Sequence, residues 1–120
     1  MMENYINIVA QAFYGNRTET EIKVENIDRF ILGYLDDSIK INSQIDRTII
    51  NVPNTENIVI IYNKYKEDEV DRNNRKPLAI IPEYNIKIYS RCIVCKMNND
   101  GKFESLHYND YDKFMKYLSE

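Results

Sequence analysis

The amino-acid sequence predicts an α+β fold, in which a mainly antiparallel sheet of about five to seven strands carries two short helices. The chain has 120 residues, 43% of them hydrophobic, which is enough for one packed core. Short runs of β-branched and aromatic residues dominate the sequence, whereas apolar residues recur at helical spacing only at about residues 26–35 and 109–118. Three glycines and three prolines leave no linker, so residues 1–120 are expected to form a single domain.

The first third of the chain is expected to form a strand and then a helix. Residues 4–13 alternate without a polar face, which predicts a strand buried on both sides, and a Gly-Asn pair then predicts a turn. In residues 26–35 five apolar side chains share one helical stripe, and Asn26 is placed to cap it. Gly33 can lie inside this helix, or end it in a left-handed conformation and leave the last two residues to the next strand.

Extended segments are expected in the middle of the chain. Residues 38–42 and 47–52 are short and could pair as a hairpin. Residues 57–65 are β-branched or aromatic nearly throughout, which predicts a central strand covered on both faces. Residues 66–76 are the most polar stretch and predict an exposed loop, whereas residues 77–85 predict a short strand at a sheet edge, because prolines bracket it.

Residues 84–97 are expected to form one long strand that carries both cysteines of the chain. Because strand side chains alternate between faces, Cys92 and Cys95 should project from opposite sides of the sheet. Such a pair cannot chelate one ion or close a disulfide without breaking the strand. A zinc site would also lack ligands, because the chain has no other cysteine and a single histidine, His107. We therefore predict buried free thiols, no metal site and no cofactor.

The sequence Asn-Asp-Gly after this strand predicts a three-residue hairpin loop with Gly101 in the left-handed position. Met97 then pairs with Phe103, which is a favourable apolar contact. The same register pairs Lys96 with Glu104, Cys95 with Ser105 and Val94 with Leu106. Residues 109–118 return to helical spacing, with Asn109 placed to cap a helix that packs on the sheet.

No catalytic residues are assigned, and we do not expect an enzyme. The chain lacks the motifs of phosphate-binding loops, zinc proteases and nucleophile elbows. His107 is interpreted as a surface or capping residue, since no orienting partner is marked for it. The acidic run of Glu67, Asp68, Glu69 and Asp71 lacks the spacing and the central glycine of a calcium loop, which favours a solvated charge run.

The candidate binding surface is a stretch in which aromatic and basic residues interleave. Tyrosines are favoured at protein interfaces, because they bury area and keep a polar tip. The same mixture can stack on a nucleotide or on single-stranded RNA. Acidic residues within the stretch and a net charge of −3 favour a protein partner. The expected contact residues are Tyr62, Lys64, Tyr65, Lys66, Glu67, Asp68, Glu69, Arg72 and Arg75.

Membrane insertion and secretion are not expected. The longest apolar run, residues 58–62, is far too short to span a bilayer. The N-terminal residues carry an acid where a signal peptide has basic residues, and no cleavage-like pattern follows. We expect a soluble intracellular protein.

Four pieces of the chain carry a family resemblance: FILGYL at residues 30–35, IVIIYN at 58–63, RKPLAIIPEYN at 75–85 and GKFESLHYNDYDKFMKYL at 101–118. Together they resemble a family of small uncharacterised domains encoded by bacteriophages and other mobile elements. Leu32 departs from the family pattern, which has a second turn glycine there, and no catalytic residues carry over.

The resemblance implies an accessory protein of a phage or mobile element that acts in the cytoplasm of a bacterial host. It implies a binding protein of the anti-CRISPR type, which inhibits a host defence system by contacting a defence protein or ribonucleoprotein. The alternative is a protein that binds a nucleotide or RNA and sequesters a defence signal or guide. A further alternative is an RNA-cleaving enzyme.

Overall fold

The computed structural model shows the α+β fold that the sequence predicts. The described residues are 5–10, 18–35, 43–55, 57–66, 68, 70, 76–89 and 91–118. Their strands are β1 (Tyr5–Ala10), β2 (Thr18–Lys23), β3 (Ser43–Ile50), β4 (Asn57–Tyr65), β5 (Ala79–Ile81), β6 (Ile86–Ile88), β7 (Cys92–Met97) and β8 (Phe103–Glu104). Their helices include α1 (Ile27–Tyr34) and α3 (Tyr108–Leu118), and 3-10 turns lie at Val24–Asn26 and Pro82–Tyr84.

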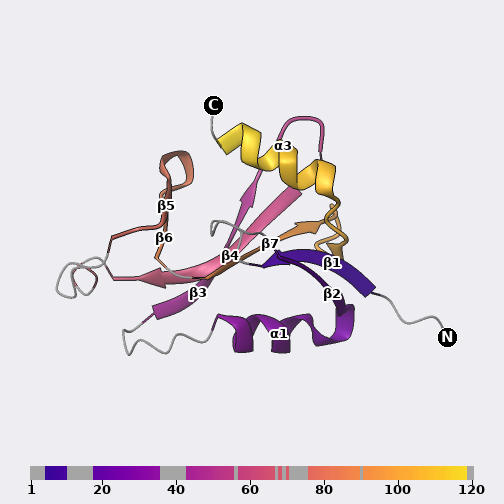
Figure 1. Ribbon diagram of the computed structural model, residues 1–120, viewed down its shortest axis with the longest axis horizontal. Helices are drawn as coiled ribbons and strands as arrows, with labels where there is room; N and C mark the ends of the chain where they lie inside the picture. The colour runs from indigo at the N-terminus through magenta and orange to yellow at the C-terminus, as the bar shows by residue number, and fades with distance from the viewer. Residues whose placement is uncertain are drawn as a thin grey trace.

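The strands form one large antiparallel sheet and one small one. The large sheet has the order β2-β1-β7-β4-β3, with β8 also paired to β7, and the small sheet consists of β5 and β6. Figure 1 shows helix α1 on one face of the large sheet and helix α3 on the other. The small sheet lies beside the C-terminal end of β4 in the same view.

Strand β4 lies in the interior of the large sheet, between β7 and the edge strand β3, as its continuous apolar sequence predicts. It pairs with β3 over Ile58–Tyr65 and with β7 over Asn57–Tyr62. Ile58 and Ile60 belong to the core cluster under α3, whereas Val59 and Ile61 belong to the cluster under α1. All four side chains are at most 1% exposed. Successive residues of β4 therefore belong alternately to two separate cores. Each face of the sheet must accordingly be covered by other elements of the fold.

Helix α3 and the small sheet together cover one face. Phe114 and Tyr111 of α3 are buried against the large sheet, which confirms the predicted packing of this helix. Ile81, Ile86 and Ile88 of the small sheet extend the same core. Strand β5 pairs only with β6 among the described strands, so the predicted edge position of this proline-bracketed strand is confirmed.

Helix α1 covers the other face through its predicted apolar stripe, of which Ile27, Ile31 and Leu35 are buried. Gly33 lies inside the helix, so the first of the two predicted alternatives holds. Asn26 occupies the predicted N-cap position of α1, but its side chain makes no capping hydrogen bond, because the residue also ends the preceding 3-10 turn. At the other end, buried Asn63 donates through Nδ2 to the Leu35 carbonyl over 2.7 Å, which satisfies a helix-end acceptor.

The prediction of one long strand over residues 84–97 is wrong. The 3-10 turn ends in Asn85, which adopts a left-handed conformation (φ 55°), and β6 runs only from Ile86 to Ile88. Strand β7 then begins at Cys92 in the other sheet. The extended segment is divided into two strands because Ile86 and Ile88 face the core from the small sheet, while β7 lies between β1 and β4 in the large sheet.

The two cysteines nevertheless point to opposite faces, as expected from their spacing within β7. Cys92 lies in the core under α3, and Cys95 lies in the core under α1. Both are free thiols and 1% exposed. Burial raises the pKa of the Cys95 thiol to about 12, although the charge of Arg47 opposes this.

The hairpin after β7 has the predicted register near its loop. Lys96 pairs with Glu104 and Met97 with Phe103, and Gly101 has a left-handed φ of 79°. The two further pairs expected from this register do not belong to the ladder, because β8 ends at Glu104.

Strand β1 replaces these missing pairs. Leu106 donates its backbone N–H to the Asn7 carbonyl over 2.8 Å, and the Asn7 N–H donates to Ser105 Oγ over 3.1 Å. Farther along β7, Val94 pairs with Val9 of β1. The segment after β8 therefore turns from β7 towards β1.

Three further outcomes concern strands β1, β2 and β3 of the large sheet. The predicted N-terminal strand is confirmed over Tyr5–Ala10, with buried residues on both faces. Strand β2 was not predicted, because its Thr-Glu alternation shows no apolar face and Ile22 is its one buried hydrophobic residue. Strand β3 pairs with β4, while the proposed partner at residues 38–42 and the predicted Gly-Asn turn lie outside the described residues.

Both thiols are expected to resist modification in the folded protein. A thiol-reactive probe such as DTNB at pH 8 should release no colour within minutes, and two equivalents after addition of guanidinium chloride. The physical reason is that attack needs an accessible thiolate, whereas both sulfurs are buried and the pKa of Cys95 is raised. Immediate reaction of either cysteine without denaturant would contradict the opposed, buried placement.

Candidate functional site

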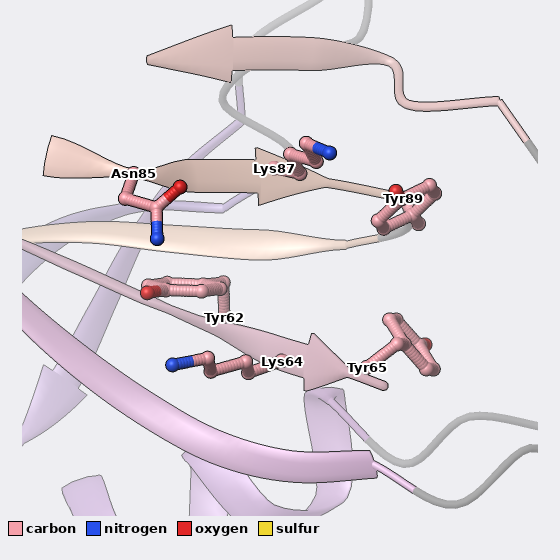
Figure 2. A pocket seen from close by; sticks show the side chains of 6 residues that line it. All are labelled: Tyr62, Lys64, Tyr65, Asn85, Lys87 and Tyr89. Carbon is pink, nitrogen blue, oxygen red and sulfur yellow. The ribbon is translucent and has the colours of Figure 1, made fainter. Parts of the chain in front are cut away.

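Three of the predicted contact residues meet in a hollow at the end of the large sheet. Tyr62, Lys64 and Tyr65 of β4 line it from one side. Asn85, Lys87 and Tyr89, in and around β6, line it from the other side. The hollow has a volume of about 70 Å³. Figure 2 shows the six side chains that line it, with the ammonium groups of Lys64 and Lys87 pointing in different directions.

The hollow arises from the unequal lengths of the strands around β4. Pairing with β7 ends at Tyr62, which faces Cys92, while β4 continues to Tyr65. The last residues of β4 therefore extend past β7, and the small sheet lies beside them. The rings of Tyr65 and Tyr89 meet there edge to face, with centroids 5.7 Å apart. This pairing fixes one wall of the hollow.

The wall formed by Tyr62 is held from strand β3. The Tyr62 hydroxyl donates to Asp46 Oδ2 over 3.5 Å and shares a 3.4 Å hydrogen bond with Thr48 Oγ1. Burial raises the pKa of the Tyr62 phenol; the hydrogen bond with Thr48 opposes this shift and the Asp46 carboxylate adds to it. Tyr62 is therefore neutral at physiological pH.

The charged side chains that line the hollow are both cationic. Its lining carries two ammonium groups, those of Lys64 and Lys87, and none of the six lining residues is acidic. Both lysines are exposed, whereas Tyr62 and Tyr65 are buried to more than nine-tenths. Asp46 approaches only the hydroxyl of Tyr62, from the neighbouring strand. The lining of the hollow thus combines two lysine side chains with the buried rings of Tyr62 and Tyr65.

Two exposed aliphatic side chains lie next to the hollow. Ile80 of β5 is the direct cross-strand partner of Lys87, so both project from the same face of the small sheet. Leu78 precedes β5 and donates its backbone N–H to the Ile88 carbonyl over 2.6 Å. Ile80 is 55% exposed and Leu78 48% exposed. We call the six lining residues together with Leu78 and Ile80 the tyrosine–lysine face.

The other predicted contact residues do not line the hollow. Lys66 and Asp68 are exposed beyond the end of β4. Glu67, Glu69, Arg72 and Arg75 lie outside the described residues, as does Asp71 of the acidic run. The predicted exposed loop needs a correction at Val70, which is 2% exposed and donates its N–H to the Lys66 carbonyl over 3.1 Å. Its apolar side chain joins the protein interior because burial stabilises it.

Sequence reasoning missed the half of the face that the small sheet supplies. The available signal was the alternation Ile86-Lys87-Ile88, which places a lysine outward between two buried residues. The single strand predicted over residues 84–97 contains Asn85, Lys87 and Tyr89. Their approach to β4 depends on the division of that segment into β6 and β7.

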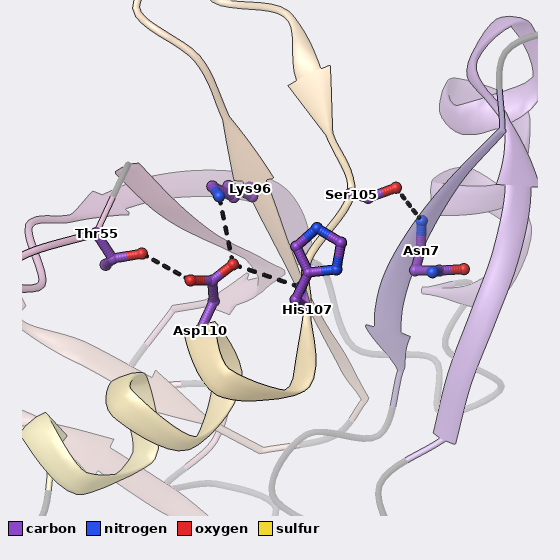
Figure 3. Close-up of polar contacts among 6 residues, drawn as sticks. All are labelled: Asn7, Thr55, Lys96, Ser105, His107 and Asp110. Carbon is purple, nitrogen blue, oxygen red and sulfur yellow. Dashed lines mark hydrogen bonds and ion pairs between the residues drawn. The ribbon is translucent and has the colours of Figure 1, made fainter.

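His107 belongs to a structural cluster at the start of α3, which Figure 3 shows. Asp110 accepts hydrogen bonds from Thr55 Oγ1 (3.0 Å), Lys96 Nζ (3.3 Å) and the His107 N–H (3.5 Å). The His107 carbonyl accepts the first helical hydrogen bond, from Tyr111. His107 is therefore the N-terminal cap position, and its predicted capping role is confirmed through its backbone.

The predicted cap at Asn109 is wrong, because this residue lies inside α3. Asp110 takes over its function by binding back to the His107 N–H, and Lys96 ties the helix end to strand β7. The side chains of Lys96 and Asp110 are only 14% exposed. Burial opposes ionisation of Asp110, but its three hydrogen bonds and the Lys96 charge together hold its pKa below the usual range.

The described residues show neither an assembled metal site nor a membrane-spanning helix. No cluster of three or more His, Cys, Asp and Glu side chains with metal-binding geometry occurs among them. Nor does any of their helices combine the length and apolar character needed to cross a bilayer. The tyrosine–lysine face presents side chains that can contact another molecule.

Replacement of Asp110 is expected to test the anchor of α3. Asp110→Asn should lower the free energy of unfolding by about 2 kcal/mol at pH 7, because it weakens charge-assisted hydrogen bonds. The folded pKa of Asp110 is lowered, so its stabilisation is present above the ordinary pKa of about 3.9 and is lost as the pH falls through the folded value. The difference from wild type, measured by urea unfolding, should therefore narrow below about pH 4. The exposed loop variant Asp100→Asn should show no comparable loss at pH 7.

Tyr62→Phe is expected to remove a phenol whose pKa is raised in the folded protein. The difference in absorbance at 295 nm between wild type and variant should show one phenol that titrates above the ordinary pKa of about 10. Because a raised pKa favours the neutral form in the folded state, its stabilisation is present below about pH 10 and is lost as the pH rises further. A difference step at or below pH 10 would contradict the buried placement of this ring.

Comparisons with known proteins assign no family to the chain. No family model matches it, and no curated protein or solved structure is significantly similar to it. The resemblance to phage-encoded domains therefore stays a prediction, and the functional argument depends on the tyrosine–lysine face.

Proposed function

We propose that this protein is a non-enzymatic binding protein of a phage or mobile element, which inhibits a bacterial host defence system by protein–protein contact. In this proposal the tyrosine–lysine face covers a functional surface of a defence protein or ribonucleoprotein in the host cytoplasm. The observation that carries the contact is a hollow lined by three tyrosines and two lysines, with the exposed Ile80 directly opposite Lys87.

The composition of this face is that of a protein interface. Interface cores are enriched in tyrosine and apolar side chains, whereas charged groups surround them. Tyr65 supports Tyr89 edge to face, so a partner would meet a half-buried Tyr89 ring that is held in place. Binding then costs little side-chain ordering, which favours affinity.

The volume of the hollow favours a protein over a small molecule. Pockets that enclose a drug-sized ligand have volumes of about 300–1,000 Å³, whereas this hollow has about 70 Å³. A whole nucleotide does not fit inside it, but one protruding side chain of a partner does. The exposed Leu78 and Ile80 would extend the contact beyond the hollow.

The biological context of the proposal, a bacterial host and its defence system, comes from the resemblance to small domains encoded by bacteriophages and other mobile elements. Accessory proteins of phages and plasmids that inhibit host defence act on proteins in the bacterial cytoplasm. An inhibitor of that kind needs a binding face and no catalytic centre, and the described residues offer such a face.

The proposal is tested with two exposed apolar positions on different faces. Ile80→Glu places a charge within the tyrosine–lysine face, whereas Leu32→Glu places one on α1, where Leu32 is 63% exposed. Tagged full-length protein is used for capture from a bacterial lysate, followed by mass spectrometry and by phage-plating assays on hosts with a defence system. Ile80→Glu should lower recovery of the partner and inhibition of the defence about tenfold or more, because interface hot spots contribute more than 1 kcal/mol.

Leu32→Glu should keep both activities within about twofold, since exposed substitutions away from a contact have small effects. Thermal melting of both variants provides the folding control. A partner retained equally by Ile80→Glu and wild type would contradict the placement of the interface, and loss from both variants would contradict its specificity.

The alternative function is favoured by one observation, the two ammonium groups beside tyrosine rings. A protein that sequesters a nucleotide or RNA would use these groups to neutralise phosphate and to stack bases. Addition of a nucleotide panel or single-stranded RNA should then raise the melting temperature, whereas the protein-binding proposal expects no change.

A further inference from the structure

We propose that Asp46 blocks the outer edge of strand β3, so that this edge does not pair with β3 of a second copy of the chain. The inference does not depend on the proposed function. It rests on the position of β3 in the large sheet, on the charge pattern of the two outer strands and on the hydrogen bonds of Asp46.

Strand β3 is an outer strand of the large sheet. Among the described strands it pairs only with β4, over Ser43–Ile50. The free edge of such a strand carries backbone N–H and C=O groups that can pair with another chain, and lysine and proline are common protections against this. The sequence of β3 contains neither residue, and Ile49 is 50% exposed. Strand β3 therefore needs another protection.

The other outer strand, β2, is protected by its charge. Its sequence alternates threonine and glutamate, and Glu19 and Glu21 are exposed. Antiparallel pairing of two copies of β2 would bring these carboxylates together, and like charges on facing strands are unfavourable. Strand β3 has no such repeat, because its two charged residues, Asp46 and Arg47, are adjacent and opposite in sign.

Asp46 occupies a backbone donor in the middle of β3. The Arg47 N–H donates to Asp46 Oδ1 over 2.8 Å, and this hydrogen bond is exposed. Because β4 covers the inner side of β3, an exposed N–H of this strand lies on its outer side. The donor that an added strand would use at this position is therefore already bound.

The Asp46 carboxylate is held in this position from β4. Its second oxygen, Oδ2, accepts a hydrogen bond from the Tyr62 hydroxyl over 3.5 Å. Tyr62 is buried, so it holds the carboxylate from the interior of the protein. Asp46 is thus a fixed acceptor for the Arg47 N–H and not a freely rotating surface side chain.

The side chain of Arg47 does not protect the edge itself. Its Nη2 lies 3.3 Å from Asp28 Oδ1 of helix α1, and its guanidinium lies over the Phe103 ring, 5.5 Å from the centroid. The arginine charge is therefore directed across the face of the sheet that α1 covers. The backbone at the middle of β3 depends on Asp46.

The test measures self-association of the full-length protein by sedimentation velocity at increasing concentration. Asp46→Ala removes the acceptor, whereas Asp46→Asn removes the same charge and keeps a side-chain oxygen that can accept the Arg47 N–H. Thr48→Val removes the 3.4 Å hydrogen bond between Thr48 and Tyr62 and leaves Asp46 in place. Melting curves show whether each variant is folded.

Asp46→Ala should self-associate at concentrations about tenfold lower than wild type, because a symmetric pair of β3 strands gains a hydrogen bond at each uncovered N–H. Asp46→Asn and Thr48→Val should stay within about threefold of wild type, since both keep the acceptor. Addition of Ile49→Lys to Asp46→Ala should reverse the association, because a charged side chain on an edge strand opposes pairing.

Several outcomes would overturn the inference. Asp46→Ala could associate no more than wild type, or Asp46→Asn could associate as strongly as Asp46→Ala, which would assign the effect to charge. Equal association of Thr48→Val would assign it to a loosened Tyr62 ring. Association that Ile49→Lys does not reverse would place the contact on another surface. Association of wild type that Ile49→Lys abolishes would show that the edge is open although Asp46 is present.

Discussion

The burial of strand β4 on both of its faces is the constraint on which the rest of the fold depends. Ile58 and Ile60 require a cover on one side of the sheet, and Val59 and Ile61 require one on the other. A helix of eight residues, α1, packs on one side. On the other side α3 shares the task with the small sheet, whose inner residues extend the same core. The small sheet is thus part of the cover, and its outer face is left for contact with solvent or a partner.

Features that depend on local chemistry could be predicted from the sequence. The central strand follows from an unbroken apolar run, and the hairpin register follows from the left-handed preference of Gly101. The opposed cysteines follow from strand alternation alone, and remain correct although the strand is shorter than predicted. The cap position of Asn26 follows from the sequence, although its side chain makes no capping hydrogen bond. The predicted cap at Asn109 falls after the start of α3, because several neighbouring side chains can cap and the choice depends on the surrounding fold.

Features that depend on distant segments could not be predicted in the same way. Residues 86–88 and 92–97 have the same β propensity, and only the need to cover the core assigns them to different sheets. Strand β2 carries a single buried hydrophobic residue, Ile22, and owes its place to backbone pairing with β1. The candidate site shows the same division. Its β4 half is contiguous and was identified, whereas the half around Lys87 is brought there by the break after β6.

Exposure alone does not separate a binding residue from an incidental one, since apolar atoms form much of any protein surface. Leu32 is more exposed than Ile80, yet it lies on the outer side of α1, away from the hollow. Ile80 lies on a two-stranded sheet whose inward residues already supply its core contacts, so folding does not require an apolar group there. An exposed hydrophobic edge strand is also an aggregation hazard. In the proposed function, Ile80 lies directly opposite Lys87, where a partner that contacts the tyrosine–lysine face would cover it.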